Sequence, residues 1–475
     1  MELPAFEMTP FWVLYYFIYI FLVLTAVLHM LYQKRSPQNL TVWLLTLLLL
    51  PYIGILLYLI FGSRKVLYKH NKPNIIIPSQ PQSTAKENTP ENDLADRIGR
   101  LLISDQIANL SLDNRIALYN APEETFNEFM QAVQHAQTCI HIETYILELD
   151  VTGNAILNAL IDKARQGVEV RLLMDAIGSF GLYRQPKPLR ALVEAGGQYA
   201  FFHPLFKNFF NSQINLRNHR KLYLFDHQTG FTGGMNLSND YFGTLENTPK
   251  QGRWQDLMFK IQGPVLAHYH IIFNEDWRYT TNEKLNNHQA WPFCQGSGAR
   301  VQAVPSGPDI HKDALFESLL QALYAAENDI CILSPYFIPD SSIMNALMIA
   351  IKRGVTVTLV TPEKSDHIIF DLGRSSYMHE LSDAGGRIHL YKGGMLHAKL
   401  VLIDRQAMMF GTANLDYRSL FINHELANWV YNRPLIDQCW LWAERLIKHS
   451  FSYQTPNSRG RRLFENFTRI FAPIL

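Results

Sequence analysis

The chain has 475 residues, which is too long for one ordinary hydrophobic core and predicts two domains with additional segments. Its 43 lysines and arginines are balanced by 42 aspartates and glutamates, giving a formal net charge of +1. A protein dedicated to duplex nucleic acid usually has a strong basic excess, so we expect no nucleic-acid partner. The cysteines show no CxxC spacing and predict neither disulfides nor a zinc site: Cys139, Cys294, Cys331 and Cys439.

Two apolar runs without formal charge lie near the amino terminus, from Phe11 to Tyr32 and from Leu40 to Phe61. At about 1.5 Å per residue, each is long enough to cross a hydrocarbon core of about 30 Å. A cleaved signal peptide is an alternative, but it would begin with a basic region, and no lysine or arginine precedes Lys34. Two buried core helices are rarely both uncharged over such lengths. We therefore predict a two-helix transmembrane hairpin over residues 1–66.

The charges that flank the hairpin predict its orientation. The loop between the two runs holds Lys34 and Arg35. Four cations follow the second run: Arg64, Lys65, Lys69 and Lys72. This excess favours both termini in the cytoplasm, and hence a multi-pass protein whose catalytic part faces the cytoplasm. Residues 67–98 include a polar, proline-rich stretch and are predicted to be a tether.

The remainder of the chain contains an internal duplication. The segment IDKARQGVEVRLLMD (161–175) parallels AIKRGVTVTLVTP (350–362). Each has the end of a helix, a turn at Gly167 or Gly354, and an apolar run typical of a buried parallel strand. The repeated order of strands and helices predicts an α/β fold with two pseudo-symmetric domains, at 99–295 and 296–455, that share one active site.

Each repeat ends in the pattern HxKx4Dx6G[GT]xN. Its members are His219, Lys221, Asp226 and Asn236 in the first copy, and His397, Lys399, Asp404, Thr412 and Asn414 in the second. All offsets are identical in the two copies. Two matched copies at equivalent places of a duplication are very improbable by chance, so they predict a functional site.

In both motifs the histidine and the lysine are two positions apart on a predicted strand, so their side chains project to one face. Two such strands meeting across a pseudo-two-fold axis would bring together two histidines, two lysines and two asparagines. This cluster suits a phosphodiester, because lysine and amide groups can stabilise a pentacovalent transition state while one histidine attacks phosphorus and the other transfers protons. We expect no metal and no cofactor. Asp226 and Asp404 are candidate catalytic residues, although a strand-end aspartate more often fixes a turn, and we favour that structural role.

The paired motifs resemble those of the phospholipase D superfamily. The segments TGGMNLSNDYFG (232–243) and GTANLDYRSLFINHELA (411–427), together with the hairpin, resemble the bacterial cardiolipin synthase branch. The resemblance covers nearly the whole chain except the tether. It implies a covalent phosphohistidine on His219, with His397 as general acid and base, in a protein of the bacterial cytoplasmic membrane. The symmetry of the sequence does not itself distinguish the two histidines.

The resemblance also implies three contacts to the substrate phosphate: Asn236, Asn414 and Thr412. It places a carboxylate after each motif to orient the histidine of that motif, and the matching acids are Asp256 and Glu425. Solvated surface acids are the alternative interpretation of these two residues. Gly234 stands where many relatives have serine or threonine, so no hydroxyl is available there to contact phosphate.

Two further segments are candidates for lipid contact. Residues 201–217 are rich in phenylalanine and have cations nearby, so they could enter a bilayer interface or pack equally well on the domain's own core. Residues 456–475 have apolar residues at helical spacing beside four arginines. This tail is predicted to be a basic amphipathic helix on anionic lipid, with docking on the protein as the alternative.

The predicted function is cardiolipin synthesis, in which one phosphatidylglycerol donates its phosphatidyl group to another and glycerol is released. Phosphatidylglycerol and anionic membrane lipids are thus the expected partners. A hydrolase, or a transferase that uses another alcohol, remains an alternative because acceptor choice depends on pocket shape and water exclusion. A membrane-tethered nuclease and a non-catalytic lipid-binding scaffold are less favoured. Acyl-chain preference and oligomeric state do not follow from the sequence.

Overall fold

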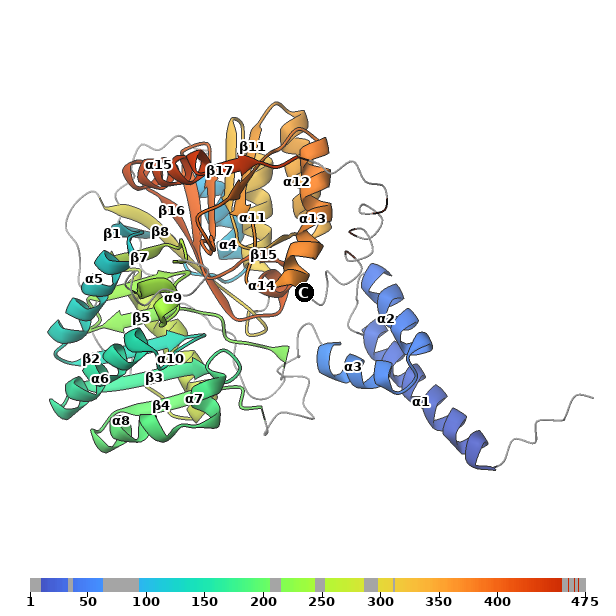
Figure 1. Cartoon of the computed structure of the whole chain (residues 1–475), viewed down its shortest axis with the longest axis horizontal. Coiled ribbons are helices and arrows are strands. Elements are labelled where there is room, and N and C mark those ends of the chain that lie inside the picture. The colour runs from blue at the N-terminus through green and yellow to red at the C-terminus, as the bar shows by residue number, and fades with distance from the viewer. Residues whose placement is uncertain are drawn as a thin grey trace, which may run out of the picture.

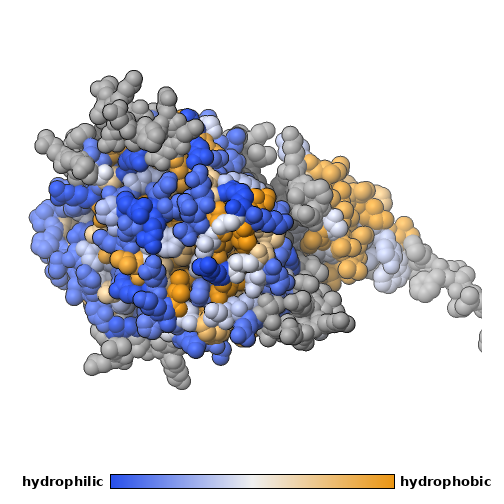
Figure 2. Space-filling view, turned by 90° about the horizontal axis from the view of Figure 1, so that it is seen from above, coloured by the Kyte–Doolittle hydropathy of each residue, from blue (hydrophilic) through white to orange (hydrophobic). Residues whose placement is uncertain are grey.

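The computed structural model of the protein describes residues 10–32, 37–62, 94–205, 215–243, 253–285, 298–310 and 312–454, with Gly460, Glu465 and Arg469. Figure 1 shows two α/β halves packed against each other and a separate group of three apolar helices. Figure 2 shows the apolar surface of these helices beside a body whose visible surface is mostly hydrophilic. The predicted α/β class with a duplicated body is therefore confirmed.

The apolar helices differ from a simple hairpin. Helix α1 (Pro10–Tyr32) is the one described helix that is long and apolar enough to cross a membrane. The second predicted span is interrupted, because α2 (Pro37–Leu49) ends just before Pro51 and α3 (Ile53–Phe61) begins just after it. Proline has no N–H to donate and its ring clashes with the preceding turn, so it breaks a helix. The prediction of two continuous spanning helices is corrected to one long helix and a broken pair.

The helix that precedes the first half in the chain packs on the second half. Helix α4 (Leu94–Ser104) includes residues 94–98, which the sequence assigns to the tether. Its buried face packs on α11 (Ala314–Ala325) of the second half. The remaining elements of the first half are β1 (Ser111–Tyr119), α5 (Pro122–His135), β2 (Cys139–Thr144), α6 (Val151–Arg165), β3 (Glu169–Asp175), α7 (Phe180–Arg184), η1 (Lys187–Leu189), α8 (Arg190–Glu194), β4 (Gln198–Phe202), β5 (Leu222–Phe225), β6 (Thr229–Gly233), α9 (Asn239–Phe242), β7 (Met258–Gln262) and α10 (Leu266–Thr281).

The second half repeats this series. Its elements are β8 (Ala299–Ser306), α11 (Ala314–Ala325), β9 (Asp329–Leu333), β10 (Phe337–Ile338), α12 (Ser341–Lys352), β11 (Thr356–Pro362), α13 (Ile368–Asp383), β12 (Arg387–Tyr391), β13 (Leu400–Ile403), β14 (Ala407–Gly411), β15 (Leu415–Asp416), α14 (Tyr417–Phe421), β16 (Glu425–Tyr431), α15 (Arg433–Lys448) and β17 (Ser450–Ser452). The predicted glycine turns are present, with φ of 87° at Gly167 and 92° at Gly354.

Fifteen of the described strands form one continuous sheet that makes the duplication visible, and β10 and β15 pair separately. From the junction outward, the first half runs β1-β7-β6-β5-β2-β3-β4 and the second runs β8-β16-β14-β13-β9-β11-β12, with β17 added at its edge. Strands β1 and β8 pair antiparallel across the junction. The parallel strands β2, β3 and β4 correspond to β9, β11 and β12. Strands β5 and β13, which lie between the lysine and the aspartate of the two HxKx4D motifs, therefore occupy equivalent positions on the two sides of the junction.

The two segments proposed for lipid contact are only partly described. Residues 206–214 of the phenylalanine-rich segment lie outside the described residues. In the tail, Glu465 is buried and lies 3.0 Å from His379, while Arg469 pairs with Glu380 at 2.7 Å and lies over the ring of Tyr377. All three partners belong to α13. These contacts favour docking of the tail on the protein over the lipid-bound helix that we predicted.

Candidate active site

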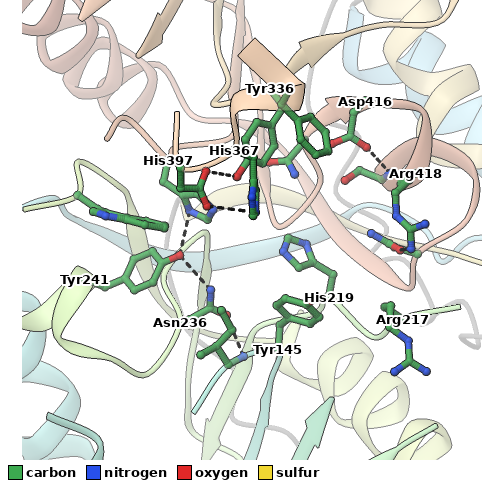
Figure 3. A pocket seen from close by; sticks show the side chains of 17 residues that line it. Tyr145, Arg217, His219, Asn236, Tyr241, Tyr336, His367, His397, Asp416 and Arg418 are labelled. Atoms are coloured by element: carbon green, nitrogen blue, oxygen red, sulfur yellow. Dashed lines mark hydrogen bonds and ion pairs between the residues drawn. The ribbon is translucent and has the colours of Figure 1, made fainter. Parts of the chain in front are cut away.

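The two motifs approach each other through backbone contacts between the halves. The amide of His219 donates to the carbonyl of His424 at 2.9 Å, and the amide of His397 donates to the carbonyl of Gln255 at 2.8 Å. Each histidine is thus held beside the segment of the opposite half that carries a candidate orienting acid, Glu425 for His219 and Asp256 for His397. Figure 3 shows His219 and His397 projecting into one pocket from the two halves.

His219 contacts the carboxylate of Glu425 from the second half. Its Nδ1 donates to Oε2 at 2.9 Å, which leaves Nε2 for chemistry in the pocket. Burial by itself would raise the pKa of Glu425, but His219, Lys221 and the hydroxyl of Thr412 outweigh burial and lower this pKa to about 2. Burial lowers the pKa of His219. The pair is therefore a neutral imidazole held by an ionised carboxylate at neutral pH.

His397 contacts Asp256 of the first half in the same manner. Its Nδ1 lies 2.7 Å from Oδ2 of Asp256. Burial raises the pKa of Asp256 to about 6, while burial and the nearby Lys399 ammonium hold the pKa of His397 well below its usual value. Both side chains are almost completely buried. This second dyad is the pseudo-symmetric counterpart of the first.

The dyads correct the expected pairing of acids and histidines. Asp256 and Glu425 were expected to orient the histidine of the motif that each follows, but each orients the histidine of the opposite half. Their exposures of 1% and 0% rule out the alternative of solvated surface acids. Neither half alone contains both members of either dyad.

The two lysines lie beneath the pocket rather than in its lining. The ammonium of Lys221 donates to the carbonyl of His219 at 2.8 Å, and that of Lys399 donates to the carbonyl of His397. Burial lowers the pKa of Lys399 to about 8 and holds that of Lys221 well below its usual value. Nζ of Lys399 also lies 2.9 Å from Nδ1 of His397. The two cations therefore act on the pocket through their charge and hold the backbone of the histidine motifs, and Lys399 contacts the imidazole as well.

The pocket has a volume of about 190 Å³ and is lined by both asparagines of the motifs. Asn236 accepts from the amide of Ile146 at 3.3 Å and donates to the hydroxyl of Tyr241 at 3.0 Å. Asn414 keeps its side-chain oxygen without a hydrogen-bond partner in the described part of the protein. The positions of both amides at the pocket wall are suited to contacts with a substrate phosphate.

Thr412 does not lie in the pocket. It is completely buried, its hydroxyl donates to Glu425, and it accepts from the amide of Leu426 at 2.9 Å. The expectation that Thr412 contacts phosphate is corrected: it positions the acid behind His219. At the equivalent place in the first half, a Cβ on Gly234 would lie 2.3 Å from Oδ1 of Asp256, so the glycine makes room for that carboxylate.

The motif aspartates hold turns at the ends of strands. Asp226 has φ of 51°, and its carboxylate accepts from the amides of Gln137, Thr138 and Cys139 at 2.7–3.0 Å. Asp404 has the same φ and accepts from three consecutive amides, 327–329, at 2.8 Å. Neither lines the pocket. Their place among the candidate catalytic residues is therefore corrected in favour of the structural role.

The structure adds pocket residues that sequence reasoning missed. Aromatic rings flank the histidines, with Tyr145 5.0 Å from His219, and Tyr241 and Trp254 5.3 and 5.1 Å from His397. Charged residues also line the wall: Arg217, Asp366, Asp416 and Arg418. The signal that could have found three of them is their short, fixed distance from a motif asparagine, as in NLSNDY and NLDYR.

A buried ion-pair network supports the first dyad from behind. Arg220, which is fully buried, pairs with Asp276 and Asp309, and its Nε donates to the carbonyl of Glu425 at 3.1 Å. Among the described residues, Asp276, Asp309 and His424 form the only group with spacing suited to a metal ion. The guanidinium of Arg220 already supplies a positive charge to both aspartates, so the cluster fits a structural role without a metal.

Comparison with known proteins agrees with this geometry. The profile of a family described as "Cardiolipin synthase, PLD-like domain" matches residues 129–277 and 319–447, more than half of the chain. A second family, described as "Phospholipase_D-nuclease N-terminal", matches residues 17–63. The two matched body segments coincide with the two halves of the fold.

Individual relatives are similar over almost the whole length. Cardiolipin synthase 1 of Bacillus cereus is 33% identical over 464 residues, which are 93% of this chain and 90% of the relative. A probable cardiolipin synthase of Bacillus subtilis is 33% identical over 96% of this chain and 93% of its own. The crystal structure of phosphatidylserine synthase from Haemophilus influenzae has a TM-score of 0.59 at 14% identity, covering 80% of this chain and 100% of that one. The last similarity concerns the fold alone.

Proposed function

The chain belongs to the cardiolipin synthase family of phospholipase D-like proteins, and from this premise we propose that it joins two molecules of phosphatidylglycerol into cardiolipin and glycerol through a phosphohistidine. The observation that carries the proposal is the pair of buried histidine–carboxylate dyads facing one pocket. Two oriented imidazoles are what a double-displacement phosphoryl transfer requires, one as nucleophile and one as proton carrier.

In the first step, Nε2 of His219 attacks the phosphorus of the donor. The bond from phosphorus to the glycerol oxygen breaks. His397, which takes up a proton when the phosphate anion binds beside it, gives that proton to the leaving alkoxide. In the second step, His397 takes the proton from a hydroxyl of the second phosphatidylglycerol, whose oxygen attacks phosphorus and releases His219. Assigning the nucleophile to His219 rests on the family resemblance, and it is consistent with the more acidic carboxylate, Glu425, behind it.

The charges around the pocket favour an anionic substrate. Lys221 and Lys399 lie beneath it, and Arg217 and Arg418 line one side. Together with amide donors from Asn236 and Asn414, these cations can stabilise the additional negative charge of a pentacovalent phosphorus. The wall opposite the arginines is aromatic and partly apolar, which limits access of water as a competing acceptor.

We further infer that the protein resides in the bacterial cytoplasmic membrane through α1, with α2 and α3 together returning across it. The four cations that follow α3 support placing the catalytic halves in the cytoplasm. Labelling of single cysteines placed after α3 and in the loop before α2, using a reagent that cannot cross the membrane, tests this topology. Labelling of the position after α3 in intact cells would exclude a cytoplasmic body.

The decisive experiment supplies the purified full-length protein with phosphatidylglycerol labelled in its phosphate, in mixed micelles. Wild-type protein should release glycerol and form cardiolipin. His219→Ala should acquire no label. His397→Ala should acquire label only from a phosphatidyl donor with a nitrophenolate leaving group, which needs no proton, and should not pass it on. His135→Ala, which changes an exposed histidine on α5, should behave as wild type. Phosphatidic acid as the only product would mean that the protein is a hydrolase and not a transferase. Label on the His219→Ala protein would mean that His397 is the nucleophile and His219 the proton carrier.

A further inference from the structure

Four large apolar side chains lie exposed next to the pocket, two from each half. Ile177 and Phe180, which follow β3, are 41% and 47% exposed. Ile368 and Ile369, which begin α13 after β11, are 77% and 63% exposed. Strands β3 and β11 are equivalent in the duplication, so the two pairs occupy related positions. Single exposed apolar residues are common, but a matched arrangement at one site is not explained by chance exposure alone.

The first pair is tied to the catalytic motif through Asp175. One carboxylate oxygen accepts from the amide of Ile177 at 2.8 Å, and the other accepts from the amide of Asn218, the neighbour of His219, at 3.0 Å. The hydroxyl of Ser179 donates to the carbonyl of Tyr145, a pocket residue, at 3.1 Å. The turn that presents Ile177 and Phe180 is therefore held at a set position relative to His219.

The second pair is tied to the opposite wall. Phe370, the next residue of α13, lines the pocket and packs on Tyr336 with ring centroids 4.4 Å apart. The hydroxyl of Tyr336 donates to Asp366, which also lines the pocket. Ile368 and Ile369 thus stand at the mouth of the pocket, on the side of the second half.

The charge beside the first pair indicates what these residues contact. No acidic residue occurs between Ala176 and Val193, whereas Arg184, Lys187 and Arg190 do, and all three are exposed. None of these cations forms an ion pair within the described part of the chain. Exposed apolar side chains beside unpaired cations are the combination that binds an anionic lipid interface.

We propose that Ile177, Phe180, Ile368 and Ile369 form an apolar rim that enters the interface of an anionic bilayer and presses the mouth of the pocket onto the lipid head groups. This inference rests on the proposed function, in which both substrates are bilayer lipids. The rim brings a phosphodiester to the histidines without extracting the lipid from the membrane. The attachment through Asp175 sets the depth of His219 relative to the membrane surface.

Site-specific fluorescence tests the rim directly. An environment-sensitive label is placed on Ile177→Cys or Ile369→Cys in a Cys294→Ser full-length protein, reconstituted in phosphatidylglycerol vesicles. Leu441→Cys on α15 is the matched control, because Leu441 is 59% exposed and does not line the pocket. We expect a blue shift and quenching by nitroxide lipids at both rim positions, and neither effect at Leu441→Cys. A blue shift without quenching would mean that protein covers the rim. A signal equal to that of Leu441→Cys would mean that the rim is exposed to water. Either result would contradict the proposal.

Activity on two physical forms of one substrate separates the rim from catalysis. The variant with serine at all four rim positions should lose about tenfold or more of its rate on phosphatidylglycerol in bilayers. Its rate on monomeric, short-chain phosphatidylglycerol should stay within about twofold of wild type, as should a Leu441→Ser control on both. Equal losses of rate on bilayer and monomeric phosphatidylglycerol would mean that these residues act in catalysis instead. No loss of rate on either form would mean that they do not contribute to lipid binding. If neither the wild-type protein nor the rim variant acts on any phosphatidylglycerol, the proposed function is wrong. The fluorescence quenching would still test independently whether the rim enters the bilayer.

Discussion

Nδ1 of His219 lies 2.9 Å from Oε2 of Glu425, although 206 positions separate the two residues in the chain. The reciprocal contact joins His397 to Asp256 at 2.7 Å across 141 positions. Each half therefore supplies the histidine of one dyad and the acid of the other. A duplication arranged in this way is active only when both halves are folded against each other.

The crossed dyads predict distinct defects for the two acids. With a substrate whose leaving group is nitrophenolate and needs no proton, Glu425→Gln should slow formation of the phosphoenzyme by about 100-fold or more, because it disturbs the orientation of His219. Asp256→Asn should form the phosphoenzyme at nearly the wild-type rate and be slow only in transfer to the acceptor. Rapid-quench measurements of labelled protein distinguish the two steps. Equal slowing of formation in both variants would contradict this division of roles.

Lys399 predicts an alkaline limit to activity. Burial lowers its pKa to about 8, so its positive charge is present below that pH and is lost as the pH rises through it. If this charge stabilises the transition state, kcat/KM should fall above about pH 8. Lys399→Arg keeps a cation at all these pH values and should move the limit upward, even though its altered geometry lowers the maximum rate. If the fall in kcat/KM occurs at the same pH in Lys399→Arg, a group other than Lys399 causes it.

Thr412 is expected to act only through Glu425. Thr412→Val removes the hydroxyl that donates to the carboxylate and should reduce kcat by about tenfold, the usual scale of a hydrogen bond to a charged group. In a Glu425→Gln background the same change should cost less than about twofold, because the interaction is already altered. A full, additive loss in the double variant would indicate that Thr412 contacts substrate directly.

The buried guanidinium of Arg220 is expected to support the fold. Arg220→Met leaves Asp276 and Asp309 buried without their cation and should lower the free energy of unfolding by about 3–5 kcal/mol. Arg165→Met, which breaks an exposed pair with Asp162, should cost less than about 1 kcal/mol. Denaturant unfolding of the detergent-solubilised proteins gives both values. Similar stability in the two variants would show that the network contributes nothing to the fold.

The turn aspartates should affect stability and spare chemistry. Asp404→Ala removes the acceptor for three backbone amides and should lower the free energy of unfolding by about 1–3 kcal/mol. Its kcat at a temperature well below unfolding should stay within about twofold of wild type, and the same holds for Asp226→Ala. A large loss of kcat with unchanged stability would restore the catalytic interpretation.

The sequence by itself determined the features that depend on local spacing. The two HxKx4D motifs, the glycine turns at Gly167 and Gly354 and the βαβ order follow from short-range patterns, and their recurrence identified the duplication and both histidines. The apolar run of α1 was likewise evident from composition. Pro51 lies at the break after Leu49, but a proline within an apolar run does not by itself predict a break, because bilayer helices often tolerate proline.

Tertiary structure alone decided which acid serves which histidine. Asp256 and Glu425 each follow one motif in the chain, and only the packing of the halves brings them to the other motif. The same packing buries Thr412 behind Glu425 and places Arg220 among the acids of two different segments. The pairing of each histidine with its acid joins residues that are 141 and 206 positions apart in the chain. A local sequence pattern contains no information about which residue lies at that separation, so only the packing of the two halves determines the partner.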